Sequence, residues 1–250
     1  MPGDAAMSSI VQRVARQALA TYRSSARSGE PAARSFQENH SELQGLLTEV
    51  RAADLKLVPR RADARLPVRR GDPPVTYMHI CETDHFSMGV FLLKTGASIP
   101  LHDHPGMHGL LRVLYGKARI RCFDRLQRPG GGGARGGAGT RGRTGALRHS
   151  VLRSTGDYTE DSGPCVLYPD RDNLHQIDAV DGPTAFLDIL APPYDPDEGR
   201  DCQYYKVLPA AEDKDTEQGE QGEELWLMEI SQPPDFWCGG EPYPGPEASL

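Results

Sequence analysis

Three histidines are the residues of this chain best suited to chemistry. His102 and His104 are separated by one residue, and His175 lies far along the chain. On a β-strand, residues i and i+2 point to the same face, so His102 and His104 could hold one metal ion from one side. A third imidazole from a distant strand would complete a three-nitrogen face and leave the opposite side open for a substrate and dioxygen. This pattern predicts an oxygen-handling metalloenzyme.

His108 competes with these three residues as a ligand. It lies four residues after His104, and on a continuous strand this even offset would place it on the same face. Pro105-Gly106 is expected to break the strand, so that His108 projects elsewhere and supports the site or the core. His40 is expected to face solvent.

Composition restricts the classes of partner. The chain has 250 residues, of which 38% are hydrophobic, enough for one core with an appended helical segment. Its formal net charge of −7 argues against a nucleic-acid partner, because neutralising phosphates needs a basic face. We expect a monomer, since no sequence feature demands a dimer.

The cysteines and the apolar residues indicate the compartment. The five cysteines are widely spaced and form no C-x-x-C pair, so we expect reduced thiols in a cytoplasmic protein. The sequence contains no run of eighteen apolar residues, so no membrane span is predicted. It has no apolar segment near residue 1, so no secretory signal is predicted. The first 27 residues are nearly free of acids, which fits a mitochondrial presequence as well as an ordinary amphipathic helix.

The N-terminal part, residues 1–74, is predicted to be a helical segment and a linker that pack on the rest of the chain. Ser9-x-x-Gln12 fits a capping box for the first helix, and Ser41-x-x-Gln44 fits another for a second helix at about 41–53. Residues 56–74 are rich in Arg and Pro and are typical of a surface linker.

From residue 75 to 250 the pattern is mostly β. Short apolar segments separated by turn residues predict a closed barrel or a double-sheet jelly roll, followed by a C-terminal extension. The predicted strands are Val75–Cys81, Phe86–Leu93, a hairpin of Leu110–Tyr115 and Lys117–Phe123 around Gly116, Cys165–Tyr168, Leu174–Val180, Thr184–Leu190, Cys202–Leu208 and Leu225–Ile230.

The segment at about 129–146 consists almost wholly of Gly, Arg, Ala and Thr. It is predicted to be a disordered insertion between two barrel strands, because it can bury too little apolar surface to offset its ordering entropy. A nucleic-acid-binding Gly/Arg tract is the alternative, which the lack of aromatic residues disfavours.

The histidines lie in a context that resembles the two motifs of the cupin superfamily, a small jelly-roll barrel with a metal inside. Gly96, His102, His104 and Gly116 match the first motif, and Gly163, Pro169 and His175 match the second. The usual cupin carboxylate falls on Gly109, the second motif has one extra residue, and its glycine and asparagine positions are Arg171 and Ala179. A neutral three-histidine set leaves room for a thiolate on Fe(II), which is a setting for oxidising sulfur.

Longer phrases narrow the resemblance: His102–Met107, His175–Asp178, Phe186–Leu190, Ala191–Asp195, Phe236–Cys238 and Glu241–Pro246. With them the chain resembles the thiol dioxygenase family of the cysteamine dioxygenases and the plant cysteine oxidases. The resemblance implies one Fe(II) per chain and the addition of both atoms of dioxygen to a thiol. The implied substrates are cysteamine, giving hypotaurine, and proteins with an N-terminal cysteine, giving cysteine sulfinic acid. It also implies an oxygen sensor that feeds the arginine branch of the N-degron pathway.

Four further residues are candidates at the site. Asp188 lies on an apolar strand, where a substrate ammonium could partner its carboxylate; a structural pair with a nearby Arg is the alternative. Tyr194 could hydrogen-bond substrate or bound oxygen, or pack at the barrel mouth. Cys202 and Tyr204 share a face of a predicted strand. The related enzymes suggest a Cys–Tyr thioether there, and an ordinary buried thiol is the simpler alternative.

Two rival functions remain open at this point. One is a cupin that uses Zn(II), Ni(II) or Mn(II) as an isomerase or a hydrolase. Gly109 counts against it, because a hard cation would prefer the lost carboxylate. The other is a binding module whose histidines hold a structural metal, which the fold alone does not distinguish from an enzyme.

Overall fold

The computed structural model describes residues 8–25, 30–60, 71–126, 145–208 and 222–250. Two helices, α1 (Ile10–Ser25) and α2 (Glu30–Glu49), come first, and short 3-10 turns lie at Ala52–Leu55 and Pro196–Glu198. The strands are β1 (Val75–Glu82), β2 (Ser87–Leu93), β3 (Ser98–Asp103), β4 (His108–Arg125), β5 (Leu147–Tyr158), β6 (Cys165–Leu167), β7 (Leu174–Ala191), β8 (Tyr204–Leu208), β9 (Glu224–Ile230) and β10 (Cys238–Gly240). The predicted insertion at 129–146 lies almost wholly outside the described residues.

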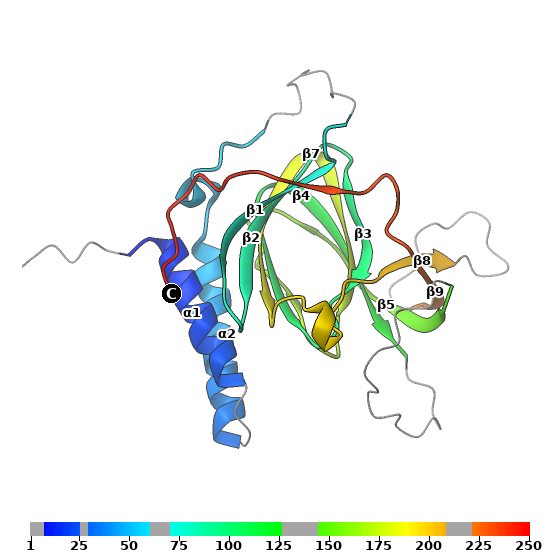
Figure 1. Ribbon diagram of the computed structural model, residues 1–250, viewed down its shortest axis with the longest axis horizontal. Helices are drawn as coiled ribbons and strands as arrows, with labels where there is room; N and C mark the ends of the chain where they lie inside the picture. Colours follow the sequence, from blue (N-terminus) through cyan, green and yellow to red (C-terminus); the bar gives the residue numbers. More distant parts are fainter. Residues whose placement is uncertain (1–7, 26–29, 61–70, 127–144, 209–221) are drawn as a thin grey trace, which may run out of the picture.

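The strands form one sheet that closes on itself. Its order is β10-β1-β2-β7-β3-β8-β9-β5-β4-β6, and an additional pairing of β4 with β7 closes the barrel. Figure 1 shows the barrel in the centre, with α1 and α2 side by side against one flank. The predicted cupin-type jelly roll with N-terminal helices is therefore confirmed.

Two long bent strands replace four short predicted ones. The predicted hairpin around Gly116 is wrong, because the chain runs on through this glycine as β4. The pair Leu174–Val180 and Thr184–Leu190 is likewise one strand, β7. β4 and β7 pair along their lengths, and the register shifts near Gly116 mark a bend in the ladder. A bulge lets a paired strand turn a barrel corner without ending, and a sequence pattern reads such a bend as a turn.

Gly116 is expected to be required at this corner. Its φ is +78°, and an added Cβ would lie 2.4 Å from the carbonyl oxygen of Pro183. Gly116→Ala should lower the free energy of unfolding by about 2–4 kcal/mol, since left-handed strain and a backbone clash add together. Urea denaturation measures the change. Gly45→Ala is the matched control, because Gly45 lies in α2 with open space around a Cβ and should gain about 0.5–1 kcal/mol. Equal shifts in the two variants would contradict this account.

The helices share a core with the outside of the barrel. Val14 and Ala18 of α1 and Leu43 and Leu47 of α2 are fully buried against strands that include β2 and β7. The predicted start of the second helix at about residue 41 is wrong, since α2 begins eleven residues earlier, at Glu30. The first half of α2 has a polar sequence, so its contacts with other elements are not evident from the sequence. His40 is buried, contrary to expectation, and its ring stacks on Phe36.

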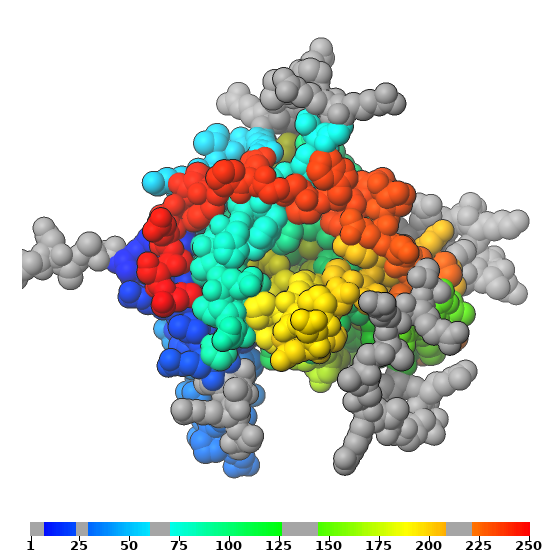
Figure 2. Space-filling model, viewed as in Figure 1, coloured from blue at the N-terminus to red at the C-terminus, as the bar shows by residue number. Residues whose placement is uncertain are grey.

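The two ends of the chain are tied together. The Ser9 hydroxyl caps α1 by accepting a hydrogen bond from the Gln12 N–H, as the sequence predicts. The Gln12 side chain, however, exchanges two hydrogen bonds with the backbone of Ser249. Earlier in the same C-terminal segment, β10 pairs in parallel with β1 at the edge of the sheet. Figure 2 shows the C-terminal segment, orange to red, running along the edge of the barrel beside the start of β1 and reaching α1.

Candidate metal centre

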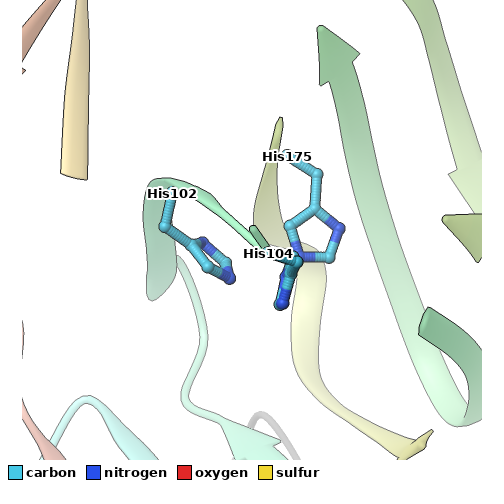
Figure 3. Close-up of side chains that lie close together, drawn as sticks. All are labelled: His102, His104 and His175. Atoms are coloured by element: carbon cyan, nitrogen blue, oxygen red, sulfur yellow. The ribbon is translucent and has the colours of Figure 1, made fainter. Parts of the chain in front are cut away.

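The three predicted histidines meet inside the barrel. His102 is on β3, His104 follows the end of that strand, and His175 is on β7, directly opposite His102 in the strand register. All three are buried, and one nitrogen of each lies within 4.8 Å of the others. Figure 3 shows the rings converging on one space. Among the described residues, these three side chains form a group that could hold one metal ion.

Hydrogen bonds on the outer nitrogens set the orientation of two rings. His102 Nδ1 donates to the carbonyl of Pro100 at 2.8 Å. The Tyr194 hydroxyl donates to the carbonyl of Asp103 at 2.9 Å, so His104 Nδ1, 2.7 Å away, donates to the tyrosine oxygen. Both rings therefore turn a lone pair on Nε2 toward the centre, the arrangement typical of metal-binding histidines.

The separation of the nitrogens fits one ion. His104 Nε2 and His175 Nε2 are 3.0 Å apart, about the separation of two nitrogens that bind an ion at right angles with bonds of about 2.1 Å. His175 Nδ1 is buried and has no hydrogen-bond partner among the described residues. A cation between the rings would bind the nitrogens that converge here, while His175 Nδ1 is the outer nitrogen of its ring.

Burial keeps these imidazoles neutral. It lowers the pKa of His102 to about 4, against a smaller opposing effect of its bond to Pro100. Burial first, and neighbouring histidines second, lower the pKa values of His104 and His175 well below the usual range. Neutral imidazole is the form that binds metals, so the site is ready for an ion at neutral pH.

The carboxylate of many cupin sites has no counterpart here. Gly109 occupies that position on β4, and an added Cβ would lie 2.9 Å from a methyl group of Leu167. A side chain at this position would require Leu167 to shift, and in the described residues no fourth ligand joins the three histidines. The donor set is three neutral nitrogens.

The other predicted site residues line the same cavity. This metal cavity has a volume of about 460 Å³, and its lining includes the three histidines, Asp188, Tyr194, Cys202 and Tyr204. Burial raises the pKa of Asp188 to about 7. Its carboxylate has no ion-pair partner in the described part of the chain, so the alternative of a structural pair with an Arg finds no support there.

Cys202 lies just before the strand that was predicted to contain it, because β8 begins at Tyr204. Its thiol is nevertheless within hydrogen-bond reach of the hydroxyls of Tyr194 and Tyr204. The strand register places Tyr204 opposite His102. The thiol and both phenols therefore gather on one side of the histidines.

Comparison with known proteins decides the family. The PCO_ADO family model matches residues 46–248. The chain belongs to the PCO_ADO family. It is 56% identical to 2-aminoethanethiol dioxygenase of Mus musculus and 54% identical to that of Homo sapiens, with 99% of each chain covered in both cases. It is 30% identical to plant cysteine oxidase 1 of Arabidopsis thaliana over 88% of this chain and 75% of that one.

Among solved structures, a cupin superfamily protein from Desulfitobacterium hafniense is 14% identical, with a TM-score of 0.32, covering 56% of this chain and 87% of that chain. No helix in the described residues is both long and apolar enough to cross a membrane. The cysteines, all in described parts, are free thiols.

Asp103 is a residue of this PCO_ADO chain whose importance the sequence does not reveal. It lies between two of the histidines, and its carboxylate turns away from them. It accepts hydrogen bonds from the Gln203 N–H at 3.0 Å and the Tyr205 hydroxyl at 2.8 Å, and it pairs with Arg125. These contacts join β3 to the start of β8. They thereby hold Cys202 and Tyr204 beside the histidines. The alternation of side chains along a strand predicts that Asp103 points away from the histidines, but it does not predict which residues Asp103 contacts.

Asn173 is a second such residue. Its amide Nδ2 donates to the carbonyls of His104 and Tyr168, and its Oδ1 accepts from the His104 N–H. The side chain therefore fixes the turn after β3 at the position of a histidine. Its nearness to His175 in the sequence is the signal that could have identified it.

His108 of this PCO_ADO chain points away from the three histidines. Asp103 ends β3 and His108 begins β4, so the strand is interrupted as expected. Its ring packs outside the barrel, 5.1 Å from Phe36 and 6.2 Å from His40 between ring centroids. It serves the packing of α2.

This packing is expected to make stability depend on pH. Burial, and then the charge of His40, lower the pKa of His108 to about 4, with Asp170 opposing. The unfolded chain has the higher pKa, about 6.5, so stability is fully present above pH 6.5 and is lost as pH falls toward 4, by about 1–2 kcal/mol because solvent screens this partly exposed ring. Urea titrations at pH 7 and pH 4.5 measure the loss. In His108→Asn the loss of stability between pH 7 and pH 4.5 should be smaller. An unchanged pH dependence in this variant would contradict the attribution of the loss to His108.

Proposed function

We propose that this protein is an Fe(II)-dependent thiol dioxygenase that oxidises thiols carrying an amine two carbons from the sulfur. The observation that carries the proposal is the placement in one cavity of three neutral histidines and a half-buried carboxylate, Asp188, that forms no ion pair in the described residues. Its membership in the PCO_ADO family supports it. The relatives named 2-aminoethanethiol dioxygenase suggest cysteamine as one substrate.

His102, His104 and His175 would hold the iron. Imidazole suits Fe(II), and the absence of a carboxylate ligand leaves charge and space for an anionic thiolate. Bound there, Fe(II) would bring a thiolate and dioxygen together and allow electrons to pass from sulfur to oxygen. The overall change, R–SH + O₂ → R–SO₂H, is balanced without an external reductant, because sulfur supplies the electrons.

Asp188 would bind and orient the substrate. In the described residues its half-buried carboxylate has no cationic partner, and a substrate ammonium would supply one. The ammonium would also lower the pKa of the carboxyl from about 7 and keep it charged. The two substrates implied are cysteamine and an N-terminal cysteine. Free cysteine should be poor, because its carboxylate would enter the same anionic cavity.

Tyr194 would position other groups rather than react. Tyr194 holds His104 through Nδ1 and fixes its tautomer. Its pKa is raised well above the usual value, by burial first, so its hydroxyl stays protonated. Apolar residues such as Phe91, Ile99 and Phe186 complete the lining and exclude water from the reacting groups.

The proposal extends to a cellular role. Oxidation of an N-terminal cysteine to its sulfinic acid would mark a protein for the arginine branch of the N-degron pathway, and the reaction would report oxygen. The free thiols fit a reducing, cytoplasmic setting.

The test is a mass measurement of products on protein loaded anaerobically with iron. Cysteamine, a peptide with N-terminal cysteine and free cysteine are offered separately with oxygen. We expect a gain of about 32 Da on the first two and little on the third. Zn(II)-loaded protein is the control for iron. Metal bound at the histidines without oxidation of any thiol would favour the rival, a cupin that is not an oxygenase.

We also propose that Cys202 and Tyr204 form a thioether during turnover, as their contact in the metal cavity permits. The bond would join Sγ to the phenol ring with loss of two hydrogens, and dioxygen would accept the two electrons. Peptide mapping after aerobic turnover should find a linked peptide about 2 Da lighter than the sum of its parts. Cys202→Ser should lack it. Two separate peptides after exhaustive turnover of the wild type would refute the link.

A further inference from the structure

A second cavity continues from the metal cavity. This outer cavity has a volume of about 480 Å³. It shares five lining residues with the metal cavity: Phe91, Asp188, Leu190, Tyr194 and Cys238. Its other lining residues come from β1, the start of β2, β10 and the segment after β7. Asp188 therefore stands where the two cavities meet, and a molecule bound to it can extend away from the histidines.

The inner wall of the outer cavity spans three neighbouring strands. Across them the register aligns Tyr77 with Phe91 and Phe186, and Glu82 with Ser87 and Leu190. Residues directly opposite each other in antiparallel strands point to the same face. All of these side chains thus face the interior with Asp188, which lies opposite Gly89.

A β-bulge aims Glu82 at this face. The register between β1 and β2 shifts between His79 and Cys81, so one extra residue stands in β1. Without it, simple alternation would put Glu82 and Tyr77 on opposite faces. The absence of a side chain at Gly89 lets the Tyr77 ring lie over its backbone, since an added Cβ would be 2.3 Å from that ring.

The outer cavity is negatively charged. Among the described residues its lining contains two carboxylates, Asp188 and Glu82, and no Lys, Arg or His; the exposed His79 lies beside it, with its ring 6.4 Å from that of Tyr77. Burial raises the pKa of Tyr77, and the charges of Asp188 and Glu82, which line the same cavity, raise it further. Glu82 is exposed and forms no ion pair within the described ranges. A cationic group is the natural complement to it.

The distance between the carboxylates suits a peptide. Glu82 is two strands from Asp188 and two residues further along, which strand geometry converts to about 12 Å between Cα atoms. An extended peptide advances about 3.3–3.6 Å per residue. If an N-terminal ammonium binds Asp188, a long side chain on the second or third residue reaches Glu82. Cysteamine would leave the outer cavity vacant.

We propose that the outer cavity is a binding site for the peptide that follows an N-terminal cysteine, and that Glu82 selects a basic side chain at its second or third residue. The inference rests on the proposed function, since it takes the cysteine thiol to lie at the histidines. The ligand class is a peptide with N-terminal cysteine followed closely by Lys or Arg.

Competition among matched peptides tests the site. Peptides with N-terminal cysteine carry Lys, Gln or Glu at position 2, and a second set carries them at position 3. In at least one set, kcat/KM should be about two- to fivefold higher for Lys than for Gln, and lower again for Glu, at low salt. The difference should shrink in 0.5 M NaCl. Glu82→Gln should bring the Lys to Gln ratio to about one, and Glu82→Lys should invert it.

The ratio is measured within each variant, so a loss of folded protein does not mimic the result. Glu42→Gln, an exposed glutamate on α2, is the matched control and should keep the wild-type ratio. Wild-type protein that oxidises cysteamine and all peptides, with the same ratio in Glu82→Gln, would overturn the site. Iron-loaded protein that oxidises no thiol at all would instead overturn the proposed function.

Discussion

Iron retention should be lost when His175 is replaced by alanine. His175 supplies one of three ligands, and its Nε2 lies 3.0 Å from His104 Nε2. The two remaining histidines sit on one side of the site, and in the described residues no other potential ligand belongs to their cluster. Metal content after gel filtration should fall from about one iron per chain to near zero, and thiol oxidation should fall with it. Metal analysis is the primary measurement because it does not depend on activity.

The matched control is His108→Ala. His108 is near His104 in the sequence but packs against α2, so this variant should keep its iron even though its stability falls. Circular dichroism checks that both variants are folded. Full iron occupancy in a folded His175→Ala protein would remove His175 from the ligand set, and loss of iron in His108→Ala would show that the two histidines are not separable.

Substitution of Asp188 by asparagine should reduce oxidation of amine-bearing thiols by about a hundredfold or more. Removing one partner of a buried charge pair costs roughly 2–5 kcal/mol, and about 1.4 kcal/mol is tenfold. The reduction should appear in kcat/KM for cysteamine and for peptides with N-terminal cysteine. For 2-mercaptoethanol, which has no ammonium, the same variant should change kcat/KM far less.

Asp178→Asn is the comparison variant on the same strand. Asp178 lies on β7 and faces Arg121 and Gln176 rather than the metal cavity. Its substitution should leave the ratio of cysteamine to 2-mercaptoethanol oxidation unchanged. If Asp188→Asn also kept the wild-type ratio, the carboxylate would have no role in recognising the amine.

The metal site was predictable because its signal is local. Two histidines at i and i+2 share a face whatever surrounds them, and His175 stands out by its matching motif. The positioning residues Asp103 and Asn173 were not predictable in the same way, because their roles depend on partners that the fold brings together. Asp103 meets Gln203 and Tyr205, which are about a hundred residues away in the sequence.

The fold shows the same division between local and distant causes. The pattern of short apolar segments between turn residues located β1, β2 and β9 closely. It failed at Gly116, where a bulge continues a ladder that local turn chemistry would end. It failed again at residues 30–40, where a polar helix is stabilised by aromatic contacts with other elements.

The strap formed by residues 231–250 has a consequence for biosynthesis. Phe236, Trp237 and Cys238 line the metal cavity, and Cys238–Gly240 line the outer one, so this late segment walls both. The three histidines, by contrast, all lie before residue 176. A chain still emerging from the ribosome can therefore assemble its metal ligands before its substrate enclosure exists. The nascent site would be open to solvent and to any small thiol until residues 231–250 have left the ribosome and packed on the barrel.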